Sequence, residues 1–153
     1  MSRTIVLDTG PLGIVTKQHG VPDADACRRW VAEWVRNGAF FVVPAIAYYE
    51  VRRELERANN QAGIVRLDSF CHAVPNRYLV FSDNALRLGC SLWARARNAG
   101  QPTADPRELD CDVLIAAQAL TLGVPEAELI VATTNVGHLS RFVAADVWTN
   151  ITP

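Results

Sequence analysis

The chain has 153 residues, of which half are hydrophobic and a fifth are charged, as is typical of one globular domain with a substantial core. Its formal net charge is −1 at pH 7, so bulk charge does not indicate nucleic-acid binding. No stretch approaches the roughly 20 apolar residues of a membrane span, no signal peptide is recognisable, and the four cysteines lack zinc-ligand spacing. We therefore expect a cytoplasmic domain whose cysteines are free thiols in or near the core.

The first half of the chain alternates short apolar runs with stretches of helical periodicity. In chain order, the expected elements are a strand at residues 4–7, a turn at 8–11, a helix at 23–36, a strand at 40–43, and helices at 45–57 and 62–73. Asn37 and Gly38 close the first helix, and Pro44 suits the first position of the second. In the third helix, Val65, Leu67 and Phe70 are the expected core contacts.

The second half continues this alternation. In chain order, we expect a strand at 78–81, a helix from Ser82 or Asp83 to about Asn98, a proline-containing loop at 101–107, an apolar helix at 110–121, a strand at 129–132, a short helix, and an edge strand near Val147. Alternating strands and helices predict a parallel sheet with helices on both faces. Because no repeat or linker interrupts the pattern, we expect a single α/β domain over residues 1–153.

Polar side chains occur where the expected strands end. Asp8 follows the first strand, Glu50 lies in the second turn of the helix after the second strand, and Asp112 lies in the first turn of the apolar helix. Asn135 follows the fourth strand. Ligands bind beyond the carboxyl ends of the strands in open parallel sheets. The four groups therefore converge if the first and fourth strands are neighbours, which we predict.

Such a group of oxygens favours one kind of chemistry. Clustered carboxylates repel each other, and each raises the pKa of the others unless a cation neutralises them. Oxygen-only ligands suit Mg²⁺ or Mn²⁺ rather than zinc. A water polarised by such an ion can attack a phosphodiester, and the same or a second ion can stabilise the leaving oxygen. The pattern therefore predicts phosphodiester hydrolysis without a Ser, Cys or His nucleophile.

Asp8 and Glu50 also have purely structural interpretations. Asp8 could cap the turn that contains Gly10, although an acid directly after a buried strand is often functional. Glu50 could be a solvated helix residue paired with Arg53, three positions further on. Taken alone, Glu50 is balanced between the two interpretations, so the case for a site depends on the acids together.

The acids of the apolar helix divide between two roles. Asp110 and Asp112 both suit a helix N-terminus. Because residues two positions apart do not share a helix face, we expect Asp112 to face the site and Asp110 to be the cap or an auxiliary ligand. Asn135 is more often a turn residue than a ligand.

Four segments together resemble the PIN-domain family, especially VapC-like toxins of bacterial toxin–antitoxin pairs. They are residues 5–9, 45–51, 112–117 and 131–135, followed by Phe142, and they span almost the whole chain. The resemblance implies a three-layer PIN-like fold and a Mg²⁺- or Mn²⁺-dependent endoribonuclease. It places the catalytic metal ligands on Asp8, Glu50 and Asp112. It also implies an RNA substrate, a homodimer, and an antitoxin partner whose peptide segment covers the acidic site.

The sequence departs from the family pattern near its end. The fourth acidic position falls on Asn135, where many members have Asp; Asn keeps a carbonyl oxygen but loses the charge, which weakens the case for a second metal. Thr134 replaces a basic residue that is common in VapC-like chains. Thr9 and Thr133 remain available as auxiliary residues that hydrogen-bond metal ligands or metal-bound waters.

Other interpretations remain open. Asn135 favours a degenerate PIN domain that binds RNA or protein without cutting, whereas the three intact carboxylates oppose it. A flap-type DNA nuclease is disfavoured because no DNA-binding appendage is recognisable. Five arginines could contact RNA phosphates, but we favour solvated helix faces for them: Arg52, Arg53, Arg57, Arg95 and Arg97. Three tryptophans on expected helices suit core or dimer contacts better than base stacking: Trp30, Trp34 and Trp93.

Overall fold

The computed structural model describes residues 2–101, 105 and 110–153. Within them, five parallel strands form a sheet in the order β3-β2-β1-β4-β5. The strands are β1 (Thr4–Leu7), β2 (Phe40–Pro44), β3 (Tyr78–Leu79), β4 (Leu129–Thr133) and β5 (Ala145–Val147). In the register of β1 and β4, Leu7 lies beside Ala132. The predicted adjacency of the first and fourth strands is therefore confirmed, as is the edge strand near Val147.

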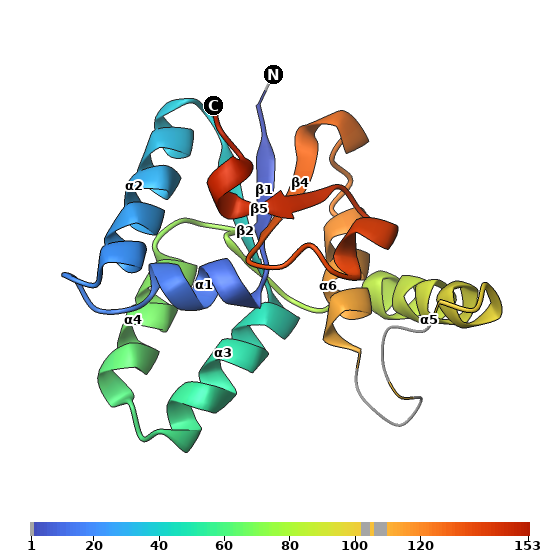
Figure 1. The fold of residues 1–153 in the computed structure, drawn as a ribbon, viewed down its shortest axis with the longest axis horizontal. Helices are drawn as coiled ribbons and strands as arrows, with labels where there is room; N and C mark the ends of the chain where they lie inside the picture. Colours follow the sequence, from blue (N-terminus) through green and yellow to red (C-terminus); the bar gives the residue numbers. More distant parts are fainter. Residues whose placement is uncertain (1, 102–104, 106–109) are drawn as a thin grey trace.

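Helices pack around this sheet to give a three-layer α/β arrangement (Figure 1). They are α1 (Thr9–Val15), α2 (Pro22–Arg36), α3 (Ala45–Arg57), α4 (Gln61–His72), α5 (Asp83–Asn98) and α6 (Cys111–Leu120), with 3-10 turns at Glu126–Glu128, Leu139–Arg141 and Trp148–Asn150. In the view of Figure 1, α1, α2 and α4 lie to the left of the strands and α5 and α6 to the right. The fold class expected from the sequence is confirmed. No helix within the described residues is both long and apolar enough to cross a membrane.

Helix α1 is the element that the sequence did not predict, since residues 8–11 were expected to form a turn. Pro11 is tolerated because it sits in the first helical turn, where its missing N–H has no partner within the helix. The N–H of Leu12 donates to the main-chain oxygen of Asp8 at 3.1 Å. Leu12 and Val15, three positions apart, are both buried against the core. Tertiary burial therefore holds a segment whose composition favours a turn.

Helix α4 faces the core with a different set of residues from the one expected. Ile64 and Leu67 are buried, and Phe70 is partly buried. Val65, by contrast, is 64% exposed, so its prediction as a core contact is wrong. Ile64, Leu67 and Cys71 follow the three- and four-residue spacing of one helix face, and Val65 lies off that face.

Smaller differences concern β3, α3 and the cysteines. Strand β3 ends at Leu79 rather than Phe81, and α3 begins at Ala45, with Pro44 as its N-cap instead of its first residue. Cys27 and Cys71 are buried and Cys111 is half-buried, but Cys90 is exposed on α5, against expectation. All four thiols are free, as predicted.

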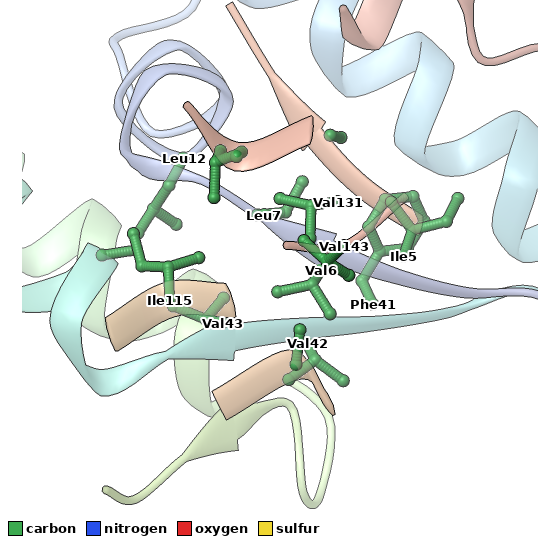
Figure 2. Packing of buried hydrophobic residues seen from close by; sticks show 14 of the residues in the cluster. Ile5, Val6, Leu7, Leu12, Phe41, Val42, Val43, Ile115, Val131 and Val143 are labelled. Carbon is green, nitrogen blue, oxygen red and sulfur yellow. The ribbon is translucent and has the colours of Figure 1, made fainter. Parts of the chain in front are cut away.

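The core lies where the central strands meet the helices on either side (Figure 2). Ile5, Val6 and Leu7 of β1 are each fully buried, as expected for a parallel strand covered on both faces. Leu12 from α1 and Ile115 from α6 are also fully buried in the same cluster. Both helix layers thereby fix the carboxyl end of β1.

The tryptophans of α2 secure the end of the chain. Trp30 and Trp34 are buried, and their indole N–H groups both donate to the main-chain oxygen of Ile151, at 2.7 and 3.1 Å. Trp30 also makes edge-to-face contacts with Phe41 and Trp148. The prediction that Trp30 and Trp34 make core contacts is therefore confirmed.

Candidate functional site

Three carboxylates from separate elements influence one another at the carboxyl end of β1. Asp8 is the N-cap of α1, Glu50 lies on α3 and Asp112 lies in the first turn of α6. The negative charge of Glu50 raises the pKa of Asp8, and the charges of Asp8 and Glu50 both raise the pKa of Asp112. The three acids that the sequence singled out therefore lie within electrostatic range of one another, and their role as metal ligands stays a prediction.

Burial is the largest cause of the raised pKa of both Asp8 and Asp112, whose ordinary value is 3.8. For Asp8, the hydrogen bond from Thr133 lowers the pKa and the charge of Glu50 raises it. For Asp112, the neighbouring acids raise the pKa and His138 lowers it. Ionising Asp8 and Asp112 together without a counter-ion is therefore unfavourable, and a bound cation would relieve the repulsion between the carboxylates.

Two threonines hold two of these carboxylates in place. The Thr9 hydroxyl donates to Glu50 Oε1 at 2.7 Å, and the Thr133 hydroxyl donates to Asp8 Oδ2 at 2.7 Å. Thr133 Oγ1 also accepts the N–H of Asn135 at 3.1 Å. The contacts expected for the two threonines are present, and they fix the direction of each carboxylate before any ligand binds. A role of either threonine at a metal stays a prediction.

Asp110 and Asp112 have the different positions that their spacing predicts. Asp110 Oδ1 accepts the N–H of Val113 at 3.2 Å and caps α6. Its other oxygen, Oδ2, is buried and has no hydrogen-bond partner within the described residues. Asp112, in contrast, interacts electrostatically with Asp8 and Glu50.

Asn135 is exposed in the turn that follows β4. Its main-chain N–H and oxygen lie 3.1 and 3.0 Å from the hydroxyl oxygen of Thr133. Asn135 is therefore linked to Asp8 through the Thr133 hydroxyl, and it uses its main chain rather than its amide side chain for this link. A ligand role for its amide stays a prediction.

Gly10 and Thr134 lie in close contact, which packs the start of α1 against the segment after β4. A Cβ atom at Gly10 would overlap the side chain of Thr134. Gly10 is therefore required for this close approach. Because Asp8 and Thr9 immediately precede Gly10, the same contact sets where their side chains emerge relative to Thr133.

Arg53 provides a positive charge at the edge of the acidic group. Its Nη2 lies 3.6 Å from Glu50 Oε2, and its guanidinium carbon lies 5.1 Å from the ring centroid of Tyr49. The Glu50–Arg53 pair, which the sequence offered as the structural interpretation of Glu50, is thus present. It coexists with the influence of Glu50 on Asp8 and Asp112.

The sequence did not point to Cys111 and His138. The Cys111 thiol hydrogen-bonds to Glu50; burial and the charge of Glu50 raise the pKa of Cys111 to about 12, so it stays a neutral thiol at physiological pH. His138 lowers the pKa of Asp112, and its Nδ1 is buried without a hydrogen-bond partner in the part of the chain that the structure describes. The position of Cys111 between two acids was a usable signal, whereas His138 follows an irregular segment that offers none.

A cavity of about 450 Å³ opens beside the site, between α1, α3 and α4. Thr9 and Glu50 belong to its lining, together with Val51 and Leu55 on α3 and Arg66 on α4. The cavity joins an apolar surface to one of the acids, so a bound molecule could contact both.

The oxygen donors at the site, three carboxylates and two threonine hydroxyls that hydrogen-bond to two of them, are of the kind that suits Mg²⁺ or Mn²⁺. Among the described residues, no three Asp, Glu, His or Cys side chains are close enough to form a ready-made metal cage. Glu50 and Asp8 are instead held by Thr9, Arg53 and Thr133. Such a donor set fits an ion that is held by few carboxylates and keeps several waters, as Mg²⁺ usually does.

Comparison with known proteins identifies the fold. No family model and no curated protein sequence matches the chain. Solved structures do match it. One is the structure of VapBC2 from Rickettsia felis bound to a promoter DNA fragment, which is 15% identical to this chain. The match covers 95% of this chain and 98% of that chain, with a TM-score of 0.69. VapBC-1 from nontypeable Haemophilus influenzae is 19% identical, with coverages of 96% and 99% and a TM-score of 0.69.

A third match supports the same conclusion. FitAcB from Neisseria gonorrhoeae is 21% identical, with 96% of this chain and 99% of that chain covered and a TM-score of 0.68. At these identities the agreement concerns the path of the chain, which it covers almost from end to end. The chain has the three-layer α/β PIN-like fold of its VapC-like structural neighbours.

Proposed function

We propose that the protein is a metal-dependent endoribonuclease that hydrolyses RNA phosphodiester bonds and acts as the toxin of a toxin–antitoxin pair. One observation carries this proposal: Asp8, Glu50 and Asp112 come from three separate elements, and Glu50 hydrogen-bonds to the chain neighbours of the other two acids, Thr9 and Cys111. A fold shared with VapBC and FitAcB structures supports it.

In this proposal, Asp8, Glu50 and Asp112 hold Mg²⁺ or Mn²⁺. When bound, the ion supplies a polarised water as nucleophile and stabilises the leaving oxygen. The three acids provide the negative charge that attracts a divalent cation. Burial of Asp8 and Asp112 strengthens that attraction, because charges interact more strongly when they are removed from water.

The surrounding residues orient the acids. Thr133 fixes Asp8 and Thr9 fixes Glu50, each through a 2.7 Å hydrogen bond. Asp110 caps α6 and so keeps its first turn in place. Partners that orient ligands in this way commonly contribute 10- to 100-fold, roughly, to metal affinity or activity.

A cleavage assay tests the enzymatic part of the proposal. Wild-type protein with Mn²⁺ is expected to shorten a mixed-sequence RNA, and EDTA is expected to stop the reaction. Asp8→Asn keeps the shape of the side chain and its contact with Thr133 but removes the charge, and should reduce the rate by about 100-fold or more. Asp23→Asn is the matched control, because Asp23 is an exposed residue that pairs with Lys17 on the surface. Equal activity of the wild type and Asp8→Asn would contradict the proposal.

A second candidate function is a PIN-like module that binds RNA or protein without cutting. Asn135 in place of a fourth acid and the absence of a ready-made cage among the described residues favour it. The same assay separates the two functions when RNA binding is measured alongside cleavage. Binding without Mn²⁺-dependent cleavage would support the module.

The partner proposal is an antitoxin that covers the acidic site. Its support is that the matched structures are of VapBC and FitAcB complexes, and that a cavity with apolar lining adjoins Glu50. A short reading frame next to this gene should encode the antitoxin. Its product should copurify with the chain and inhibit RNA cleavage. The proposed homodimer is tested separately, by the mass of the isolated chain in solution.

A further inference from the structure

Arg53 and its neighbour Arg52 on α3 have different surroundings. The Arg52 guanidinium donates to the hydroxyl of Tyr48 at 2.6 Å and to carboxylates of Asp68 and Glu56 at 3.3 and 3.0 Å. These contacts tie Arg52 to the protein surface. Arg53 contacts Glu50 at 3.6 Å, beyond ordinary hydrogen-bond length, and its side chain is 48% exposed.

The position of Arg53 is held by an aromatic ring as well as by charge. Its guanidinium carbon lies 5.1 Å from the ring centroid of Tyr49, itself a half-exposed residue. A guanidinium that stacks on an aromatic ring presents its N–H donors at the edge of its plane, in a fork that suits a phosphate. Tyr49 also hydrogen-bonds to Arg53 through its side chain, so it holds the guanidinium in place and leaves the other N–H donors of the fork for a phosphate.

The acidic site creates a need for such a cation. A nucleic acid that approaches Asp8, Glu50 and Asp112 brings more negative charge to a group that already repels itself. Arg53 is on the same helix as Glu50, one turn further on, and so places a positive charge directly beside the acids. Phosphate contacts of this kind position the substrate and carry no sequence information.

We propose that Arg53 binds a backbone phosphate of the nucleic-acid substrate beside the acidic site, with Tyr49 holding its guanidinium in place. That the substrate is RNA rests on the proposed function. In the free protein, Glu50 is the counter-charge of Arg53. Removal of the charge of Glu50 should therefore release Arg53 for phosphate.

The test measures RNA binding without cleavage. A fluorescein-labelled single-stranded RNA of mixed sequence is titrated with each protein in EDTA, and its anisotropy is followed at several salt concentrations. Arg53→Gln should lower the affinity by about tenfold at low salt and reduce the slope of log K against log salt by about 1. Arg53→Lys, which keeps the charge but loses the planar fork, should keep most of the slope.

Arg36→Gln is the matched control, because it makes the same change in net charge. Arg36 is exposed in the last turn of α2, just before β2 begins, so it lies at the opposite end of the strands from Asp8. The affinity of Arg36→Gln for the RNA should stay within about twofold of the wild-type affinity, since one distant charge contributes little once salt screens it.

A double-mutant cycle of Glu50 and Arg53 tests whether the two residues act on RNA binding through each other. Glu50→Gln should tighten RNA binding, and this gain should largely disappear when Arg53→Gln is also present. Equal gains in both backgrounds would overturn the proposal, because they would mean that Glu50 acts by general repulsion alone.

Three other results would overturn it as well. They are RNA affinities of Arg53→Gln and Arg36→Gln that agree, a change in the solution mass of Arg53→Gln that makes Arg53 a subunit contact, and a wild type that does not bind the RNA. The fate of the proposed function is read separately, from Mn²⁺-dependent cleavage by the wild type. Arg53-dependent binding without cleavage would support this inference and contradict the nuclease, whereas cleavage with Arg53-independent binding would do the reverse.

Discussion

The hydroxyl of Thr133 at the end of β4 donates to the carboxylate of Asp8 at the end of β1, with 2.7 Å between Oγ1 and Oδ2. Thr133 is only 1% exposed, so the donor of this partly buried hydrogen bond is shielded from water. Because β1 and β4 are neighbouring strands, the bond connects two chain segments that are far apart in sequence. It fixes one acid of the candidate site to the sheet.

Thr133→Val should therefore destabilise the protein by about 1–3 kcal/mol, since a buried carboxylate and the N–H of Asn135 both lose a partner. The variant should also raise the pKa of Asp8 further, because the lost hydrogen bond lowers it. Urea unfolding measures the first effect. Thr149→Val, at an exposed position, is the control. A Thr133→Val protein as stable as this control would show that the bond contributes nothing.

The metal-free protein should gain stability when Asp8 loses its charge. The pKa of Asp8 is raised above 3.8 in the folded state, mainly by burial. The stability contributed by this group is therefore fully present below pH 3.8 and is lost as the pH rises through the folded pKa. Asp8→Asn avoids this loss, so in EDTA it should unfold at a higher temperature than the wild type at pH 7.

The pH dependence distinguishes this effect from a general change in packing. The advantage of Asp8→Asn should shrink as the pH falls toward 3.8, where the wild-type carboxyl becomes protonated in both states. Thermal unfolding at a series of pH values in EDTA gives the comparison. An Asp8→Asn protein that is less stable than the wild type at pH 7 would contradict the prediction.

A divalent cation should stabilise the wild type more than a variant that lacks one of the three acids. Mn²⁺ at about one hundred times its dissociation constant should stabilise the wild type by about 2.7 kcal/mol. Asp112→Asn should lose most of this gain, because Asp112 contributes one of the three mutually repelling charges. Asp23→Asn should retain it, since its carboxylate pairs with Lys17 on the surface. A wild type whose unfolding does not respond to Mn²⁺ would contradict a metal site at these acids.

The sequence predicted the sheet and the acids for a common physical reason. A buried parallel strand is a continuous apolar run, and the residues after it lie at the edge where ligands bind. Residues 4–7 followed by Asp8 show this pattern directly. The different roles of Asp110, which caps α6, and Asp112, which interacts with Asp8 and Glu50, also follow from local geometry, because residues two apart do not share a helix face.

Features that depend on tertiary contacts were not predictable in the same way. Helix α1 contains Gly10 and Pro11 and owes its helical form to the burial of Leu12 and Val15. Val65 was assigned to the wrong face of α4, because the helix carries apolar side chains at adjacent positions and its phase is decided by what it packs against. The position of His138 beside Asp112 depends on the path of an irregular segment.

Gly10 offers a direct test of how closely α1 must approach β4. Gly10→Ala should destabilise the protein by about 1–3 kcal/mol, because its Cβ would overlap the side chain of Thr134. Thr134 is exposed, so Thr134→Ala alone should have little effect, and it should recover most of the loss in the double variant.

Gly13→Ala provides the matched control within the same helix. The nearest atom to a Cβ at Gly13, in Val51, is 3.9 Å away, which is ordinary van der Waals contact. Alanine has the higher helix propensity, so this variant should be neutral or more stable by up to about 1 kcal/mol. Urea unfolding of the four proteins and the double variant gives the comparison. If Gly10→Ala and Gly13→Ala behaved alike, helix propensity alone would govern α1, and the contact with Thr134 would not set the position of Asp8 and Thr9.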